Sequence, residues 1–226
     1  EIMPSLVGSE MCIRDSLTVA WGKDGKVKYS MGASILIAGQ VIQWLRDKIN
    51  LVDHAAKTSV MAESIPDNGG VFFVPAFTGL GAPHWNTGAR GMIIGITAAT
   101  SKEQITRAAL ESMAYQTRDL LEEMERNSGI KLKELKVDGG ASKNDFLMQF
   151  QADILNCRVV RPKDIETTAL GACYLAGLGC GIFKSEDEIK ELWEADRVFE
   201  PQMDEETREN LYAQWCKAVE KSKDWL

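Results

Sequence analysis

Several features that mark common classes of protein are scarce or absent in this sequence. Histidine occurs only at His54 and His84, too few for a cluster of histidine ligands, so we expect no metal site. The longest apolar runs, such as 92–96, fall far short of the roughly 20 residues that cross a bilayer. The net charge of -7 disfavours binding to nucleic acid or anionic lipid. We therefore expect a small soluble substrate, no nucleic acid and no membrane span.

The cysteines and the length of the chain bound its setting and organisation. The five cysteines form no CxxC pair, which indicates a reducing, cytoplasmic environment. A chain of 226 residues that is 45% hydrophobic can bury one good core. Residues 1–16 show no sustained helical or strand period, so we interpret them as a foreign or disordered segment. The main domain is expected over 17–226.

Hydrophobic periodicity predicts strands and helices that alternate along the chain. The expected strands are 26–31, 71–74, 92–96, 135–138 and 158–161. The expected helices are 35–49, 53–64, 101–129, one beginning at Ser142, 168–180, 186–195 and 205–225. Residues 75–91, rich in glycine, are expected to form a long ordered loop. This alternation predicts a layered α/β domain with a sheet between helices.

The sequence Val137-Asp138-Gly139-Gly140-Ala141-Ser142 is the most informative stretch. A glycine pair between a strand and a capped helix leaves backbone without Cβ atoms, so a flat or anionic ligand can approach the helix N-terminus. The helix start is expected at the capping box Ser142-x-x-Asp145. An ordinary turn that requires positive φ explains the glycine pair equally well.

Two further stretches have both a binding and a packing interpretation. Gly39, expected inside a helix, and Gln43 one turn later would place bare backbone beside an amide, although close helix packing explains them as well. The small residues of 167–172 fit core packing by default, or a hinge surface. Arg90 is a candidate phosphate ligand, but an exposed or paired arginine is the simpler interpretation.

Taken in order, these stretches resemble the glycerol kinases, members of the FGGY class of carbohydrate kinases. The PAFTGLGAP loop and the FLMQFQADIL helix carry the glycerol assignment, whereas the GGAS turn and the ALGA helix are shared across the class. The resemblance extends over 17–226. The matching segments are AGQVIQWLRD (38–47), FVPAFTGLGAPHW (73–85), ARG (89–91), LESMAYQTRD (110–119), VDGGASKNDFLMQFQADIL (137–155) and TTALGACYLAG (167–177).

The resemblance implies a ribonuclease-H-like (actin-like ATPase) α/β domain, with a central sheet flanked by helices and the first strands of the domain missing. It implies a C-terminal domain fragment that binds ATP or ADP through Gly39 and Gln43, with Gly140 and Asn144 holding the adenosine portion. The full-length protein would phosphorylate glycerol to glycerol 3-phosphate with ATP and Mg²⁺, as a homo-oligomer.

The same resemblance places the catalytic aspartate, the glycerol ligands and the phosphate-binding hairpin in the other half of the family's chain. No catalytic residue is therefore expected here, and the fragment is expected to be inactive alone. Asp138 belongs to the adenosine side and is not the base. The sequence departs from the family at Gly32-Ala33, where glutamate and glycine are common, at His84 in place of tyrosine, and at Asn86 in place of aspartate.

Two alternatives stay open at this point. The first alternative is another FGGY sugar kinase, because the chain resembles the whole class. The other is a non-catalytic fragment that binds nucleotide or forms oligomers, since the expected base and glycerol site lie elsewhere.

Overall fold

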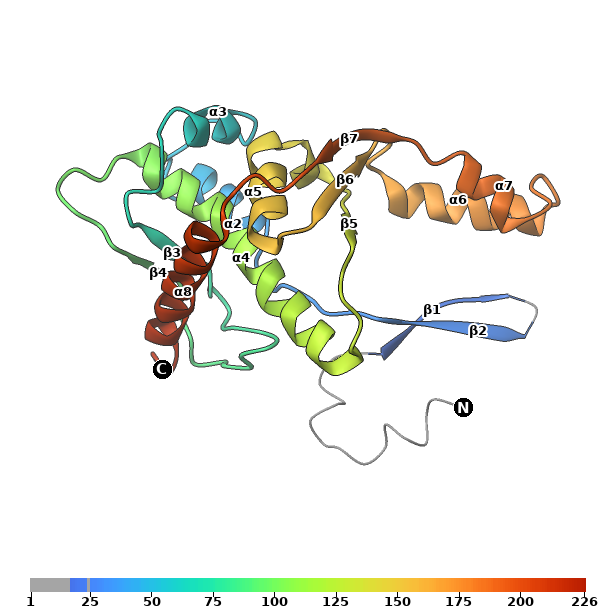
Figure 1. Cartoon of the computed structure of the whole chain (residues 1–226), viewed down its shortest axis with the longest axis horizontal. Helices are drawn as coiled ribbons and strands as arrows, with labels where there is room; N and C mark the ends of the chain where they lie inside the picture. Colours follow the sequence, from blue (N-terminus) through green and yellow to red (C-terminus); the bar gives the residue numbers. More distant parts are fainter. Residues whose placement is uncertain (1–16, 24) are drawn as a thin grey trace.

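The computed structural model describes residues 17–23 and 25–226, so the interpretation of 1–16 lies outside the described residues. The strands are β1 (Leu17–Lys23), β2 (Lys26–Met31), β3 (Phe72–Val74), β4 (Met92–Ile94), β5 (Glu134–Lys136), β6 (Arg158–Pro162) and β7 (Ala195–Phe199). The helices are α2 (Gln40–Asp47), α3 (Lys57–Glu63), α4 (Lys102–Ser128), the 3-10 helix η2 (Gly140–Lys143), α5 (Asp145–Leu155), α6 (Thr167–Gly179), α7 (Glu186–Glu191) and α8 (Glu205–Ser222). Figure 1 shows their arrangement.

The strands form three small sheets rather than the one central sheet that was expected. β1 and β2 make an antiparallel hairpin, β3 pairs with β4, and β6 lies between β5, which is parallel to it, and β7, which is antiparallel. Within the described residues, one edge of β1 and one edge of β5 pair with no strand. The expectation that the first strands of the domain are missing stays a prediction.

Helix α4 is the centre of the packed body, where it contacts α2, α3, α5 and β3 (Figure 1). The expected capping box at its start is confirmed, because the Ser101 side chain accepts from the Gln104 backbone N–H and the Gln104 side chain accepts from the Ser101 backbone N–H. Its end at Gly129, which has a left-handed conformation with φ 70°, is confirmed as well. Sequence signals at both ends therefore fixed the length of this helix.

Aromatic side chains join α4 to α8 inside the core. The rings of Tyr115 and Trp215 stack with centroids 5.2 Å apart, and Phe150 of α5 meets Tyr115 edge-on at 5.5 Å. The indole N–H of Trp215 donates to Asp119 at 2.9 Å, and the Tyr212 hydroxyl donates to the same carboxylate at 2.7 Å. Because this buried carboxylate has two donors from α8, it fixes how α8 lies against α4.

The glycine-rich loop 75–91 is ordered, as predicted, and the end of the chain holds it in place. Asn86 donates to Asp224 at 2.7 Å, and the backbone N–H groups of Trp225 and Leu226 donate to the Gly88 carbonyl. The Arg90 guanidinium donates to loop carbonyls at 2.7 and 2.9 Å. Arg90 thus stabilises the conformation of this loop.

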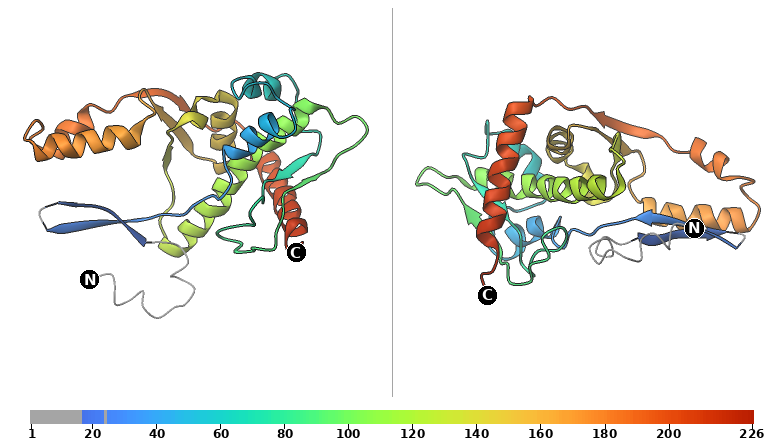
Figure 2. Two further views of the ribbon diagram at one scale, coloured as in Figure 1. Left: turned by 180° about the vertical axis from the view of Figure 1, so that it is seen from behind. Right: turned by 60° about the horizontal axis from the view of Figure 1, so that its bottom comes forward.

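Two segments project from the body. The hairpin of β1 and β2 extends on one side, and α6 and α7 form an arm beyond β6 and β7 (Figures 1 and 2). Few side chains of α6 are covered: Gly177 is its buried residue, while Leu175 is 52% exposed. Core packing, the default interpretation of the small residues in 167–172, is therefore wrong for this arm.

Candidate functional site

The turn between β5 and α5 is built differently from the sequence expectation in one respect. The 3-10 helix η2 begins at Gly140, and α5 begins only at Asp145, with Asn144 as its N-cap. The predicted capping box at Ser142 is therefore wrong, because the Ser142 hydroxyl donates back to the Gly139 carbonyl at 2.7 Å instead. The asparagine is the better cap here, since its side chain reaches the Leu147 N–H at 3.0 Å.

The glycine pair of this turn has two separate roles. Gly139 has φ 73°, a conformation that favours glycine, so the ordinary-turn explanation holds for this residue. Gly140 is exposed, and a Cβ atom built on it would meet nothing within 4 Å. The backbone at Gly140 is therefore bare and open to the approach of a ligand, as the binding interpretation requires.

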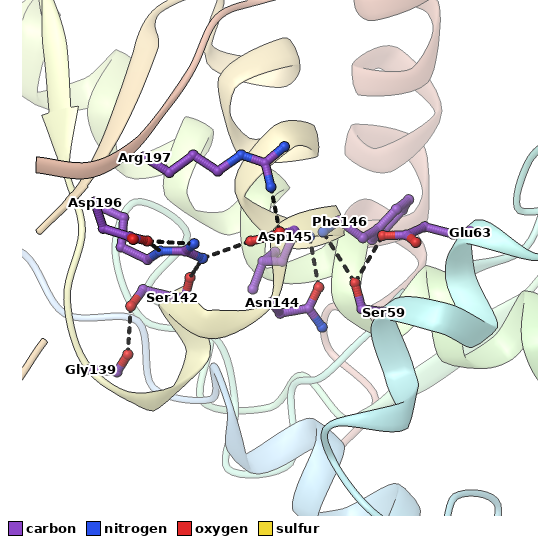
Figure 3. A network of polar contacts seen from close by, with 11 residues as sticks. Ser59, Glu63, Gly139, Ser142, Asn144, Asp145, Phe146, Asp196 and Arg197 are labelled. Carbon is purple, nitrogen blue, oxygen red and sulfur yellow. Dashed lines mark hydrogen bonds and ion pairs between the residues drawn. The ribbon is translucent and has the colours of Figure 1, made fainter. Parts of the chain in front are cut away.

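The Asn144 amide, which lies beside the start of α5 (Figure 3), has a partner at each of its two ends. Its Oδ1 accepts from the Leu147 N–H, and its Nδ2 donates to Oγ1 of Thr58 at 3.1 Å. The Thr58 hydroxyl, which is almost fully buried, donates its own proton to the Ala55 carbonyl at 2.6 Å. Since that proton is committed, Oγ1 can only accept from Asn144.

A second contact joins the start of α5 to α3. The Phe146 backbone N–H donates to Oγ of Ser59 at 3.3 Å, and the Ser59 hydroxyl donates to Glu63 at 3.0 Å (Figure 3). The first N–H groups of a helix lack partners within the helix itself. At α5, the side chains of Asn144 and Ser59 satisfy two of them.

Arginine side chains hold the opposite side of the turn. Arg161 of β6 donates to Asp145 at 2.7 Å and to the Ser142 carbonyl at 2.8 Å, and it also pairs with Asp196. Arg197 of β7 contacts the same Asp145 carboxylate (Figure 3). Burial lowers the pKa of Arg161, but the hydrogen bonds from its guanidinium to the two aspartates outweigh this and raise it overall. The negative charge of Asp145 is thus neutralised from two strands.

The arm is attached to the same turn. The Gly139 N–H donates to the Ile165 carbonyl at 2.9 Å, and the Thr167 hydroxyl at the start of α6 donates to the Asp138 carboxylate. Asp138 therefore accepts a hydrogen bond from the arm, and the expectation that it is not a catalytic base stays a prediction.

Gly39 and Gln43 lie at the beginning of α2. Gly39 is the N-cap of this helix rather than a residue inside it, so the expected cost of a glycine within a helix does not arise. A Cβ atom at Gly39 would meet nothing within 4 Å, and Gln43 is exposed one turn later. The segment before them is anchored to α4, because Gln116 donates to the Ile37 carbonyl at 3.1 Å.

The predicted site residues therefore form two pairs, one at the turn before α5 and one at the start of α2. Gly140 and Asn144 share one turn, whereas Gly39 and Gln43 share the first turn of α2. The hydrogen bonds of the Asn144 side chain run to its own helix and to α3, which follows α2 in the chain. Sequence reasoning missed Thr58, Ser59 and Arg161, since their roles depend on contacts between distant segments that no local motif reports.

Two observations concern the residues that the structure describes. Over residues 17–23 and 25–226, no group of three or more His, Cys, Asp or Glu side chains is arranged to hold a metal ion. Among the helices of the same residues, none has the length and apolar character to cross a bilayer.

Comparison with known proteins identifies the family of this chain. The C-terminal domain of the FGGY family of carbohydrate kinases matches residues 6–180. Glycerol kinase 2 of Thermotoga maritima and the glycerol kinase of Caldanaerobacter subterraneus are each 58% identical over 92% of this chain. The chain spans 42% of the length of each of these two relatives.

Solved structures agree with this assignment. The crystal structure of Plasmodium falciparum glycerol kinase with ADP superposes with a TM-score of 0.83 and 39% identity, covering 91% of this chain and 41% of that one. A ligand-bound xylulose kinase from Lactobacillus acidophilus superposes with a TM-score of 0.75 and 26% identity, covering 88% of this chain and 40% of that one. The resemblance deduced from the sequence is confirmed, and the chain belongs to the FGGY family of carbohydrate kinases, within the C-terminal domain of that family.

Proposed function

We propose that this chain is the ATP-side half of a glycerol kinase, which in its full-length form transfers the γ-phosphoryl group of ATP to glycerol and forms glycerol 3-phosphate. The observation that carries the proposal is the turn at 139–144, where bare backbone and a fixed amide lie at the start of α5. The similarity to glycerol kinases, including the complex described with ADP, supports the choice of substrate.

The residues of the turn fit the adenosine part of a nucleotide better than its phosphates. The open backbone at Gly140 allows a flat group to approach closely. Within the described residues, the Asn144 amide has two partners, which leaves one N–H and one lone pair for a polar ligand. The Asp145 carboxylate already occupies the positive end of α5 and pairs with Arg161 and Arg197, so these positive groups have an anionic partner before a phosphate arrives.

The remaining nucleotide contacts are assigned to α2 and to the other half of the protein. We infer that Gly39 and Gln43 contact the nucleotide as well, through open backbone and an exposed amide. Magnesium would be held through the phosphates and the other half, because the described residues offer no set of carboxylates for it. When bound, the metal would neutralise phosphate charge during transfer.

The partners and setting follow from the same proposal. The ligand of this chain is ATP or ADP, and glycerol binds to the full-length enzyme. That enzyme forms a homo-oligomer and is located in the cytoplasm. The excess of acidic residues argues against a nucleic acid partner.

The proposal is tested by fusing this chain to the N-terminal half of Thermotoga maritima glycerol kinase 2. We expect the fusion to form ADP only when glycerol is added, and this chain alone to form none. A second fusion carries Asn144→Ser, which keeps a helix cap but shortens the side chain. Its KM for ATP should be higher than that of the unchanged fusion. A folded fusion that forms no ADP in the presence of glycerol would contradict the assignment of this chain as the ATP-side half of a glycerol kinase.

Another FGGY sugar kinase remains the second candidate, because xylulose and gluconate kinases share the fold with TM-scores of 0.75 and 0.73. A non-catalytic fragment that binds nucleotide or forms oligomers is the third, favoured by the 42% coverage of the relatives. The glycerol kinase fusion tests the third candidate, which predicts binding of nucleotide without turnover. A parallel fusion to the N-terminal half of the Lactobacillus acidophilus xylulose kinase tests the second, which predicts faster turnover in that fusion than in the glycerol kinase fusion.

A further inference from the structure

We infer that Thr58 is a positioning residue for nucleotide binding, which acts by holding the Asn144 amide in the orientation that the nucleotide meets. The inference rests on the proposed function. Thr58 lies in α3, far from Asn144 in sequence, and it belongs to none of the segments that resemble the glycerol kinases.

The direction of each hydrogen bond around Thr58 is determined. Its side chain is 1% exposed, so water does not compete for the hydroxyl. The hydroxyl proton is donated to the Ala55 carbonyl at 2.6 Å, and Oγ1 accepts from Nδ2 of Asn144 at 3.1 Å. If the amide were rotated by half a turn, Oδ1 would face an oxygen with no proton to donate, and Nδ2 would face the Leu147 N–H.

Thr58 therefore prevents the opposite orientation of Asn144 rather than merely tolerating the observed one. The helix cap from Oδ1 to Leu147 and the bond from Nδ2 to Thr58 act on the two ends of the same amide. The remaining N–H and the remaining lone pair consequently point in set directions before a ligand arrives. Such preorganisation increases affinity because the cost of ordering the side chain is met in the folded protein.

The rest of α3 supports the same contact. Ser59 accepts from the Phe146 N–H at 3.3 Å, so successive residues of α3 bind successive parts of the start of α5. Arg161 braces the turn from the other side through Asp145 and the Ser142 carbonyl. Because both sides of the turn are held, the loss of Thr58 would free the Asn144 side chain without releasing the backbone.

The test compares ADP binding to four forms of this chain by isothermal titration calorimetry, together with their thermal unfolding. Thr58→Val keeps the shape but removes the acceptor, and we expect it to weaken ADP binding about fivefold, as for the loss of one neutral hydrogen bond. Thr58→Ser keeps the hydroxyl and should bind like the parent chain. Val60→Thr is the matched control, since Val60 lies on the same helix and is 68% exposed.

A double-mutant cycle separates positioning from a purely structural role. Asn144→Ser retains a helix cap but cannot reach Thr58, so adding Thr58→Val to it should leave ADP affinity unchanged. A purely structural role would instead weaken ADP binding equally in both backgrounds. If Thr58→Val does not fold, Thr58→Ala, which places no methyl group against the amide, is compared in its place.

The outcomes are distinct. Parent-like ADP affinity in Thr58→Val, or equal losses in the two backgrounds, would overturn the role of Thr58 and leave the proposed function standing. A parent chain that binds no ADP at high concentration would overturn the proposed function, and the role of Thr58 with it.

Discussion

The packed body and the projecting arm use apolar residues in opposite ways. Helix α4 in the body is buried on every side from Ala108 to Tyr115, and it packs against α3, α5 and β3. Helix α6 in the arm is apolar around its whole circumference yet mostly exposed, with Leu175 at 52% and the following Ile182 at 74% exposure. The comparison shows that apolar content alone does not identify a core; the surrounding elements must also cover it.

The largest effect is expected from the contrast between a buried and an exposed tryptophan. Trp215 is 1% exposed and stacks on Tyr115, so Trp215→Ala should lower the free energy of unfolding by about 4 kcal/mol. Trp225, which is 73% exposed, is the matched control, and Trp225→Ala should change it by less than about 0.5 kcal/mol. Urea denaturation followed by circular dichroism measures both. Similar losses in the two variants would show that the aromatic core is not where the structure places it.

The next effect concerns a buried ion pair of the body. Glu111 is 2% exposed and accepts from Arg107 at 2.8 Å and from Asn68 at 2.8 Å. Burial raises the pKa of Glu111 above its ordinary value of 4.5, opposed by these two donors. Arg107→Leu removes one of them, so it should cost about 3 kcal/mol near neutral pH and raise this pKa further.

The sign of the pH dependence follows from this raised pKa. Folded Glu111 keeps its proton at pH values where the unfolded chain has lost it, so the free energy of unfolding falls as pH rises from 4.5 toward the folded pKa. The fall should be steeper in Arg107→Leu. Denaturation curves over this range provide the test, with Arg126→Leu, which breaks an exposed pair with Glu123, as the control. A stability difference between Arg107→Leu and the parent chain that did not grow with rising pH would contradict the assignment.

Helix caps give a smaller contrast. Ser101 caps α4 in the body, and Ser185 caps the short α7 in the arm. We expect Ser101→Ala to lower the free energy of global unfolding by about 1 kcal/mol. Ser185→Ala should leave it unchanged, because the arm can fray without the body. Hydrogen exchange would detect the local effect at α7, and a global loss in Ser185→Ala would mean that the arm and the body unfold together.

The smallest effect is expected on the arm surface. Ile182→Ser removes an exposed apolar side chain and should change the free energy of unfolding by no more than about 0.5 kcal/mol. It should, however, reduce association of this chain at high concentration, since less apolar surface is presented to solvent. Light scattering measures that association. A large loss of stability would show that Ile182 is covered in solution.

The sequence predicted an element correctly where the residues that determine its bounds lie within that element. The bounds of α4 followed from Ser101, Gln104 and Gly129, which act within one helix. The strands β1 and β7 were not predicted, because each is defined by its pairing with another strand: β1 pairs with β2, and β7 pairs with β6.

The site shows the same division. Gly140 and Asn144 were proposed as site residues from a local glycine turn and from family resemblance, and that assignment stays a prediction, whereas Ser142 was wrongly taken as the cap. Whether Ser142 or Asn144 caps α5 depends on which side chain reaches a free backbone N–H of this helix. Asn144 does so, and its hydrogen bond to Thr58 on α3 stabilises its side chain there. Contacts between segments 86 residues apart are set by the fold as a whole, so no local pattern could reveal them.

The central claim, that the turn at 139–144 receives the adenosine part of a nucleotide, is tested most directly by nuclear magnetic resonance during titration with ADP. The account predicts that the backbone amide signal of Gly140 and the side-chain amide signals of Asn144 shift as ADP is added, while the signal of Gly129 at the far end of α4 stays in place. Shifts that leave Gly140 and Asn144 unchanged at saturating ADP would contradict it.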